Sequence, residues 1–152
     1  AALHAALGLD DTVLEINLTP NRGDCLSVLG VARDLAALHA RALASPTVPP
    51  VAPASDAAVE VRLDAPASCP SYAGRVITGL DPRARTPLWM AEKLRRSGVR
   101  CIHPLVDVTN FVMLELGQPM HAFDVAKLSA PVVVREASAG ESIVLLDGSA
   151  LE

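Results

Sequence analysis

The chain has 152 residues, of which 51% are hydrophobic and 20% are charged, and its net charge is -4. This composition excludes a disordered chain and predicts a globular protein with one domain or two small ones. The negative balance argues against a protein that coats nucleic acid along its whole surface, but it leaves room for a local basic patch.

The cysteines and the apolar runs exclude several further classes. Cys25, Cys69 and Cys101 are widely spaced and form no CxxC pair. They argue against a disulfide framework and a structural zinc site, and they fit a reducing cytoplasm. No HExxH motif or carboxylate cluster indicates a metal, and no apolar run reaches the roughly 18 residues of a membrane span.

The first 45 residues predict one strand and one helix. Apolar and polar residues alternate over residues 13–18, which is typical of a half-buried strand. Asp24 is expected to cap a helix from about residue 25 to residue 40, in which Gly30 indicates close packing. The intervening turn has the residues to hold an anion at the helix start, but local pairing of Arg22 is the favoured interpretation.

A proline-rich stretch divides the sequence. Residues 46–57 contain four prolines and predict an extended linker. Residues 1–45 are too few for an independent core, so we interpret them as the end of an N-terminal module. Residues 58–152 then form the first part of a second domain, and we expect the whole chain to be a fragment of a longer protein.

The second part predicts an α+β fold with mixed helices and a mostly antiparallel sheet, in a truncated domain. Helices and strands do not alternate with the rhythm of βαβ units. Thr86 and Pro87 are expected to open a helix that runs to Ser97. A central helix follows over about residues 105–116 and ends at Gly117. Strands are predicted over residues 59–63, 72–80, 132–136 and 142–146, with turns at Ala139-Gly140 and Asp147-Gly148.

Two polar residues stand out in the central helix. Thr109 and Asn110 lie in an almost wholly apolar run that is expected to be buried. Without partners, each would cost about 1–3 kcal/mol, so they either join an internal network or meet a ligand. His121 follows a rigid turn, and no nucleophile elbow accompanies it. Asp124 is expected to cap the next element rather than to orient the histidine ring.

The single basic concentration lies between residues 83 and 100. Six cations are opposed only by Glu92, and they are Arg83, Arg85, Lys93, Arg95, Arg96 and Arg100. A solvated helix face and a contact with RNA phosphates are both open interpretations. The scarcity of aromatic residues limits sequence-specific reading of RNA bases.

Two long stretches resemble the beta subunit of bacterial phenylalanyl-tRNA synthetase. Residues 14–34 resemble the end of its first domain, and residues 72–124 resemble the first half of its B3/B4 editing domain. The second stretch includes Pro87-Leu88-Trp89-Met90 and the run from Thr109 to Asp124.

The resemblance implies an α2β2 heterotetramer that attaches phenylalanine to tRNA(Phe) with ATP and magnesium, in the cytoplasm. It implies an editing site that hydrolyses tRNA(Phe) mischarged with tyrosine, to which Thr109, Asn110 and His121 contribute. No residue is assigned as a certain catalytic group, and no cofactor or metal is assigned to this fragment. Arg95, Arg96 and Arg100 are the candidate tRNA contacts. The family's pocket also uses residues beyond this stretch, so we expect the fragment alone to be inactive.

A second interpretation belongs to another class of function. The same fold could serve as a non-catalytic RNA-docking or scaffold module, because one fold hosts many functions.

Overall fold

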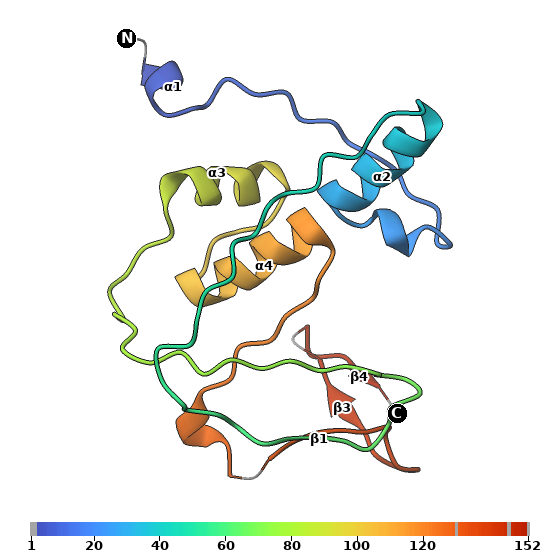
Figure 1. The fold of residues 1–152 in the computed structure, drawn as a ribbon, viewed down its shortest axis with the longest axis vertical. Helices are drawn as coiled ribbons and strands as arrows, with labels where there is room; N and C mark the ends of the chain where they lie inside the picture. The colour runs from blue at the N-terminus through green and yellow to red at the C-terminus, as the bar shows by residue number, and fades with distance from the viewer. Residues whose placement is uncertain (1–2, 130, 146, 152) are drawn as a thin grey trace. The chain divides into compact units, whose positions relative to one another are not determined.

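The computed structural model describes residues 3–129, 131–145 and 147–151 (Figure 1). The chain forms two compact units, and each combines two separate stretches. Unit 1 contains Ala1–Val51 and Leu80–Ala122, and unit 2 contains Ala52–Gly79 and Phe123–Glu152. One crossing between the units, after Val51, lies within the predicted linker. The predicted division into residues 1–45, 46–57 and 58–152 stays a prediction.

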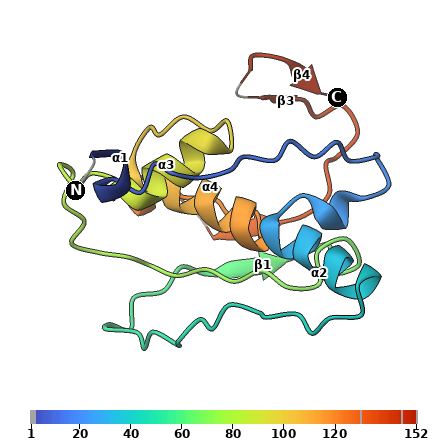
Figure 2. The same ribbon diagram turned by 90° about the horizontal axis from the view of Figure 1, so that it is seen from above.

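Unit 1 is helical. Both α2 and α3 pack against α4, and the two ribbon views show α3 and α4 side by side (Figures 1 and 2). Its elements are α1 (Leu3–Ala6), the 3-10 helix η1 (Gly23–Cys25), α2 (Val28–Leu38), α3 (Leu88–Arg96) and α4 (Pro104–Leu116).

The strand predicted over residues 13–18 is wrong. These residues form no strand, and Val13, Leu14 and Ile16 are exposed. A strand needs a neighbour with which to share backbone hydrogen bonds, and none of the described residues pairs with this segment. The alternation of apolar and polar residues is therefore not enough to form a strand in this segment.

The buried hydrophobic residues of the described chain are few. They are Cys25, Met90 and Leu94, and all belong to unit 1. Met90 and Leu94 are four residues apart, so they lie on one face of α3. The expectation that the central helix is buried is wrong, because Val106, Val108 and Met113 are exposed. Only α2 and α3 pack substantially on this helix among the described elements.

The start of α2 differs from the prediction. Ser27, rather than Asp24, caps the helix, and its Oγ accepts a hydrogen bond from the Gly30 N–H at 2.9 Å. Asp24 instead pairs with Arg22 at 3.0 Å, as local pairing of Arg22 predicts. A Cβ on Gly30 would lie 2.0 Å from the backbone oxygen of Asp24. The close packing predicted at Gly30 is therefore confirmed.

The start of α3 also needs a correction. Pro87 is the N-cap and makes no side-chain capping bond. The Thr86 hydroxyl, which was expected to cap the helix, donates a hydrogen bond to Asp107 instead. Gly98 follows the helix with a φ of 77°, a left-handed conformation that suits glycine at a helix end.

Unit 2 contains two small sheets. One pair of strands is parallel and the other is antiparallel. The predicted α+β class is therefore confirmed, whereas the prediction of a mostly antiparallel sheet is only partly confirmed. The elements are β1 (Val61–Leu63) with β2 (Val132–Val134), the 3-10 helix η2 (Val125–Lys127), and β3 (Ile143–Val144) with β4 (Ala150–Leu151). The long connection from β1 to β2 permits the parallel pairing.

The turns of unit 2 follow the sequence more closely than its strands. The Asp124 side chain caps η2 by accepting from the Ala126 N–H, as predicted. Gly148 has a φ of 85° and lies in the turn between β3 and β4. The strand predicted over residues 72–80 is wrong, since these residues form no strand. Leu146, the last residue of another predicted strand, lies outside the described residues.

Candidate functional site

The candidate site is built on α4, whose two ends are set by local chemistry. The His103 Nδ1 accepts a hydrogen bond from the Leu105 N–H at 3.3 Å, and Pro104 occupies the first turn. At the other end Gly117 adopts a φ of 76° and donates its N–H to the Met113 carbonyl. The sequence predicted the end at Gly117 but assigned no role to His103.

The buried carboxylate of Asp107 organises the first turn of α4. Asp107 is 1% exposed. Its carboxylate accepts hydrogen bonds from the Thr86 hydroxyl and from the Ile102 N–H, the latter at 2.9 Å. Burial by itself raises the pKa of Asp107, but the bonds from Thr86 and Ile102 outweigh it and hold the pKa below its usual value. Asp107 thus joins three segments: the start of α3, the loop after it, and α4.

Thr109 and Asn110 follow Asp107 by two and three residues on α4, and both are half-buried. The Thr109 hydroxyl donates to the backbone carbonyl of Val106 at 2.7 Å. Its oxygen retains an acceptor lone pair for a ligand. No hydrogen bond to the Asn110 amide is found among the described residues. Thr109 is therefore partly satisfied by its own helix, while Asn110 keeps its full donor and acceptor capacity.

His121 lies beyond α4, after an irregular segment that begins at the left-handed Gly117. The rigid turn predicted before it is wrong, because residues 117–121 form neither a turn nor a bend. His121 is exposed and belongs to unit 1, and the Gln118 amide in this segment donates to the Pro119 carbonyl at 3.1 Å.

Two hollows mark the surface of unit 1, and none of the three predicted pocket residues lines either of them. One, of about 380 Å³, is lined by Thr86, Cys101, His103 and Asp107 among others. The other, of about 610 Å³, lies along α2 around Leu35 and His39. Convergence of Thr109, Asn110 and His121 on a shared pocket accordingly stays a prediction.

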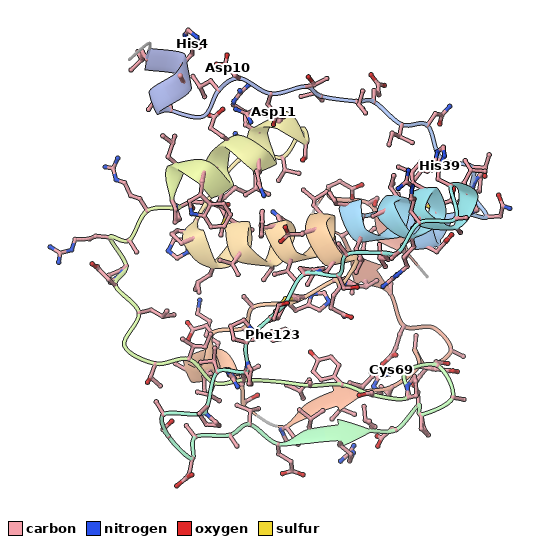
Figure 3. All side chains as sticks on the ribbon, turned by 45° about the horizontal axis from the view of Figure 1, so that its top comes forward. His4, Asp10, Asp11, His39, Cys69 and Phe123 are labelled. Atoms are coloured by element: carbon pink, nitrogen blue, oxygen red, sulfur yellow. The ribbon has the colours of Figure 1, made fainter. Side chains whose placement is uncertain are left out.

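The basic cluster separates into paired and unpaired cations. Arg96 is only 14% exposed in its side chain, contacts Asp11 at 2.7 Å, and donates to the Gly8 carbonyl. Figure 3 shows Asp11 on the N-terminal segment beside α3. Arg95 pairs with Glu92 at 2.9 Å, which lowers the pKa of that carboxyl. Arg100 is exposed and forms no ion pair within the described residues.

The sequence did not single out Asp107. An acidic residue in the first turn of an apolar helix is favoured by the helix dipole, and that signal was present. Its burial was not predictable, because the partners Thr86 and Ile102 come from outside the helix.

The described part of the chain offers no group of three or more His, Cys, Asp or Glu residues that could hold a metal ion. Nor does it contain a helix long and apolar enough to span a membrane.

Comparison with known proteins extends over nearly the whole sequence. The B3/4 domain family matches residues 68–152. The chain is 54% identical over 143 residues to the phenylalanine–tRNA ligase beta subunit of Pectobacterium atrosepticum, which covers 94% of this chain. It is 58% identical over 142 residues to that of Pseudomonas putida, which covers 93%. The chain spans 18% of the length of each of these relatives. The resemblance predicted from residues 14–34 and 72–124 is confirmed.

Proposed function

This chain belongs to the B3/4 domain family, and we propose that it forms part of the beta subunit of a phenylalanine–tRNA ligase. In this proposal the whole enzyme is a cytoplasmic α2β2 heterotetramer that attaches phenylalanine to tRNA(Phe). The supporting observation is the identity of 54–58% to phenylalanine–tRNA ligase beta subunits across more than nine-tenths of the chain.

We further propose that α4 and the segment after it contribute to a site that hydrolyses tRNA(Phe) mischarged with tyrosine. Tyrosine exceeds phenylalanine by one hydroxyl, and an apolar synthetic pocket rejects an added hydroxyl only weakly. A second site that hydrogen-bonds the hydroxyl selects the wrong product strongly. Thr109 and Asn110 bring a hydroxyl and an amide to a helix that is otherwise nearly apolar.

Each candidate residue has a role that its geometry supports. The Thr109 hydroxyl is held by the Val106 carbonyl, so its remaining lone pair accepts from a ligand hydroxyl. The Asn110 amide has no hydrogen bond among the described residues, so it can bind the substrate or the attacking water. His121 is exposed two residues after Pro119, and its imidazole assists in placing that water. Stabilisation of the oxyanion requires aligned donors, which the Asn110 amide can supply.

ATP and magnesium belong to the proposed activity of the whole enzyme. The roles proposed for Thr109, Asn110 and His121 involve neither ATP nor magnesium.

The test uses the complete ligase. Hydrolysis of Tyr-tRNA(Phe) should fall at least about tenfold in Asn110→Ala and His121→Ala, while charging with phenylalanine stays unchanged. His39→Ala is the matched control, because His39 is an exposed histidine at the end of α2 in the same unit (Figure 3). Wild-type enzyme that leaves Tyr-tRNA(Phe) intact would refute the editing role and favour the non-catalytic RNA-docking alternative.

A further inference from the structure

Two aromatic rings and a cation gather between α3 and α4. The chain has only four aromatic residues, yet Trp89 and Phe111 meet with their ring centroids 5.3 Å apart and their planes at 86°. The Lys93 Nζ lies 5.9 Å from the Trp89 centroid and 5.5 Å from the Phe111 centroid. We call Trp89, Lys93 and Phe111 the aromatic–cation cluster.

The cluster is open to solvent. Trp89 is 55% exposed, and Lys93, one turn later on α3, is also exposed. In an edge-to-face pair, one ring presents its edge to one face of the other ring, so at least one indole face is not covered by Phe111. The core contact of α3 uses Met90 and Leu94 on another face. The packing of Met90 and Leu94 in the core therefore does not explain why a large indole lies exposed at Trp89.

The charge of Lys93 is also not neutralised at close range. Its neighbours Arg95 and Arg96 both pair with carboxylates. Lys93 contributes to lowering the pKa of Asp11, but it forms no ion pair with any described residue. An exposed aromatic face beside an available ammonium matches a nucleotide, whose base stacks on an aromatic ring and whose phosphate attracts a cation.

We propose that the aromatic–cation cluster is a docking platform for the unpaired 3′ end of a tRNA. A base stacks on the open face of Trp89, and the adjacent phosphate approaches Lys93. The inference rests on the proposed function, which requires a single-stranded tRNA end close to α4. Phe111 directly follows Asn110 on that helix, so the platform and a candidate pocket residue share one rigid element.

The test measures the affinity of the complete ligase for uncharged tRNA(Phe) and for the same tRNA without its unpaired 3′ nucleotides. Trp89→Ala should weaken binding of intact tRNA by about five-fold to a hundred-fold, the range that loss of base stacking produces. Trp89→Phe should retain most of the affinity, because it keeps a stacking surface. Lys93→Ala should lower the slope of log affinity against log salt by about 0.7, the value for one contact with a single strand.

Controls separate the platform from general electrostatics and from folding. Arg33→Ala removes the same charge from an exposed position on α2 of the same unit, so its effect on the binding of intact tRNA should be smaller than that of Lys93→Ala. Truncated tRNA should bind all variants equally. If Trp89→Ala does not fold, the comparison of Lys93→Ala with Arg33→Ala decides.

Two outcomes overturn the platform. One is that Trp89→Ala and Lys93→Ala bind intact tRNA as tightly as the wild-type enzyme does. The other is an equal loss of affinity for intact and truncated tRNA, which would show that the effect does not depend on the unpaired 3′ end. Hydrolysis of Tyr-tRNA(Phe) by the wild-type enzyme is measured separately. Normal hydrolysis together with variants that bind normally refutes the platform alone, whereas absent hydrolysis refutes the editing role and with it the premise of the platform.

Discussion

Each of the two units of the chain is stabilised internally by a different kind of interaction. In unit 1, helices meet through side chains, and this unit contains every buried residue of the described chain: Cys25, Gly30, Met90, Leu94 and Asp107. In unit 2, no described residue is buried. Its order rests on short backbone ladders and on exposed ion pairs such as Arg135 with Glu141. Packing therefore specifies the first unit, while local hydrogen bonds specify the second.

This difference predicts where substitutions have large effects. Buried apolar contacts contribute several kcal/mol, whereas exposed ion pairs contribute little. The unit that carries Thr109, Asn110 and His121 is the one with the firmer internal packing. A site that must hold groups in place benefits from such a scaffold.

The largest effect is expected at Leu94, which is 0% exposed. Leu94→Ala removes buried methyl groups of α3 and should cost about 2–5 kcal/mol. Hydrogen exchange of the complete protein should show lost protection across residues 88–116. Val133→Ala in β2 is the comparison in unit 2, and its effect should be smaller because Val133 is only half-buried. Equal losses of protection in Leu94→Ala and Val133→Ala would contradict the predicted contrast between the units.

The next effect is expected at Asp107, the buried carboxylate of unit 1. Asp107→Ala leaves the Thr86 hydroxyl and the Ile102 N–H without their acceptor, at about 1–3 kcal/mol for each unsatisfied group. Urea unfolding measures the loss. Asp34→Ala is the control, since Asp34 is an exposed acidic residue of the same unit.

The stabilisation by Asp107 should also depend on pH. The pKa of Asp107 is lowered in the folded chain, so the unfolded chain binds more protons at acid pH. The contribution is therefore fully present above the usual aspartate pKa of 3.8 and is lost as pH falls through the lowered value. In Asp107→Asn, the midpoint of urea unfolding should depend less on pH over this acid range. An unchanged acid slope would assign the dependence to other carboxylates.

The comparison of the units also explains what the sequence could predict. Helix ends and turns depend on neighbouring residues, and Gly117, Asp124 and Gly148 behave as predicted. The strands expected over residues 13–18 and 72–80 require partners that a periodic pattern does not identify, and they do not form.

The candidate site shows the same division. The sequence placed Thr109 and Asn110 on a helix, and α4 confirms that placement. The sequence did not predict that the Thr86 hydroxyl donates to Asp107 instead of capping α3, because these residues lie 21 positions apart. Long-range pairings of this kind follow from packing and not from local pattern.

The smallest effect is expected at the ion pair of Arg135 and Glu141 in unit 2. Arg135 contacts Glu141 at 2.7 Å, and bonds from Arg135 and from the Ser138 N–H lower the pKa of Glu141 to about 2. Its stabilisation is present above the ordinary glutamate value of 4.5 and is lost as pH falls toward 2. An NMR titration should place the Glu141 midpoint near the lower value, and Arg135→Ala should move it upward with little change in unfolding. A large loss of stability in Arg135→Ala would mean that unit 2, too, depends on specific side-chain contacts, because solvent screens an exposed pair strongly.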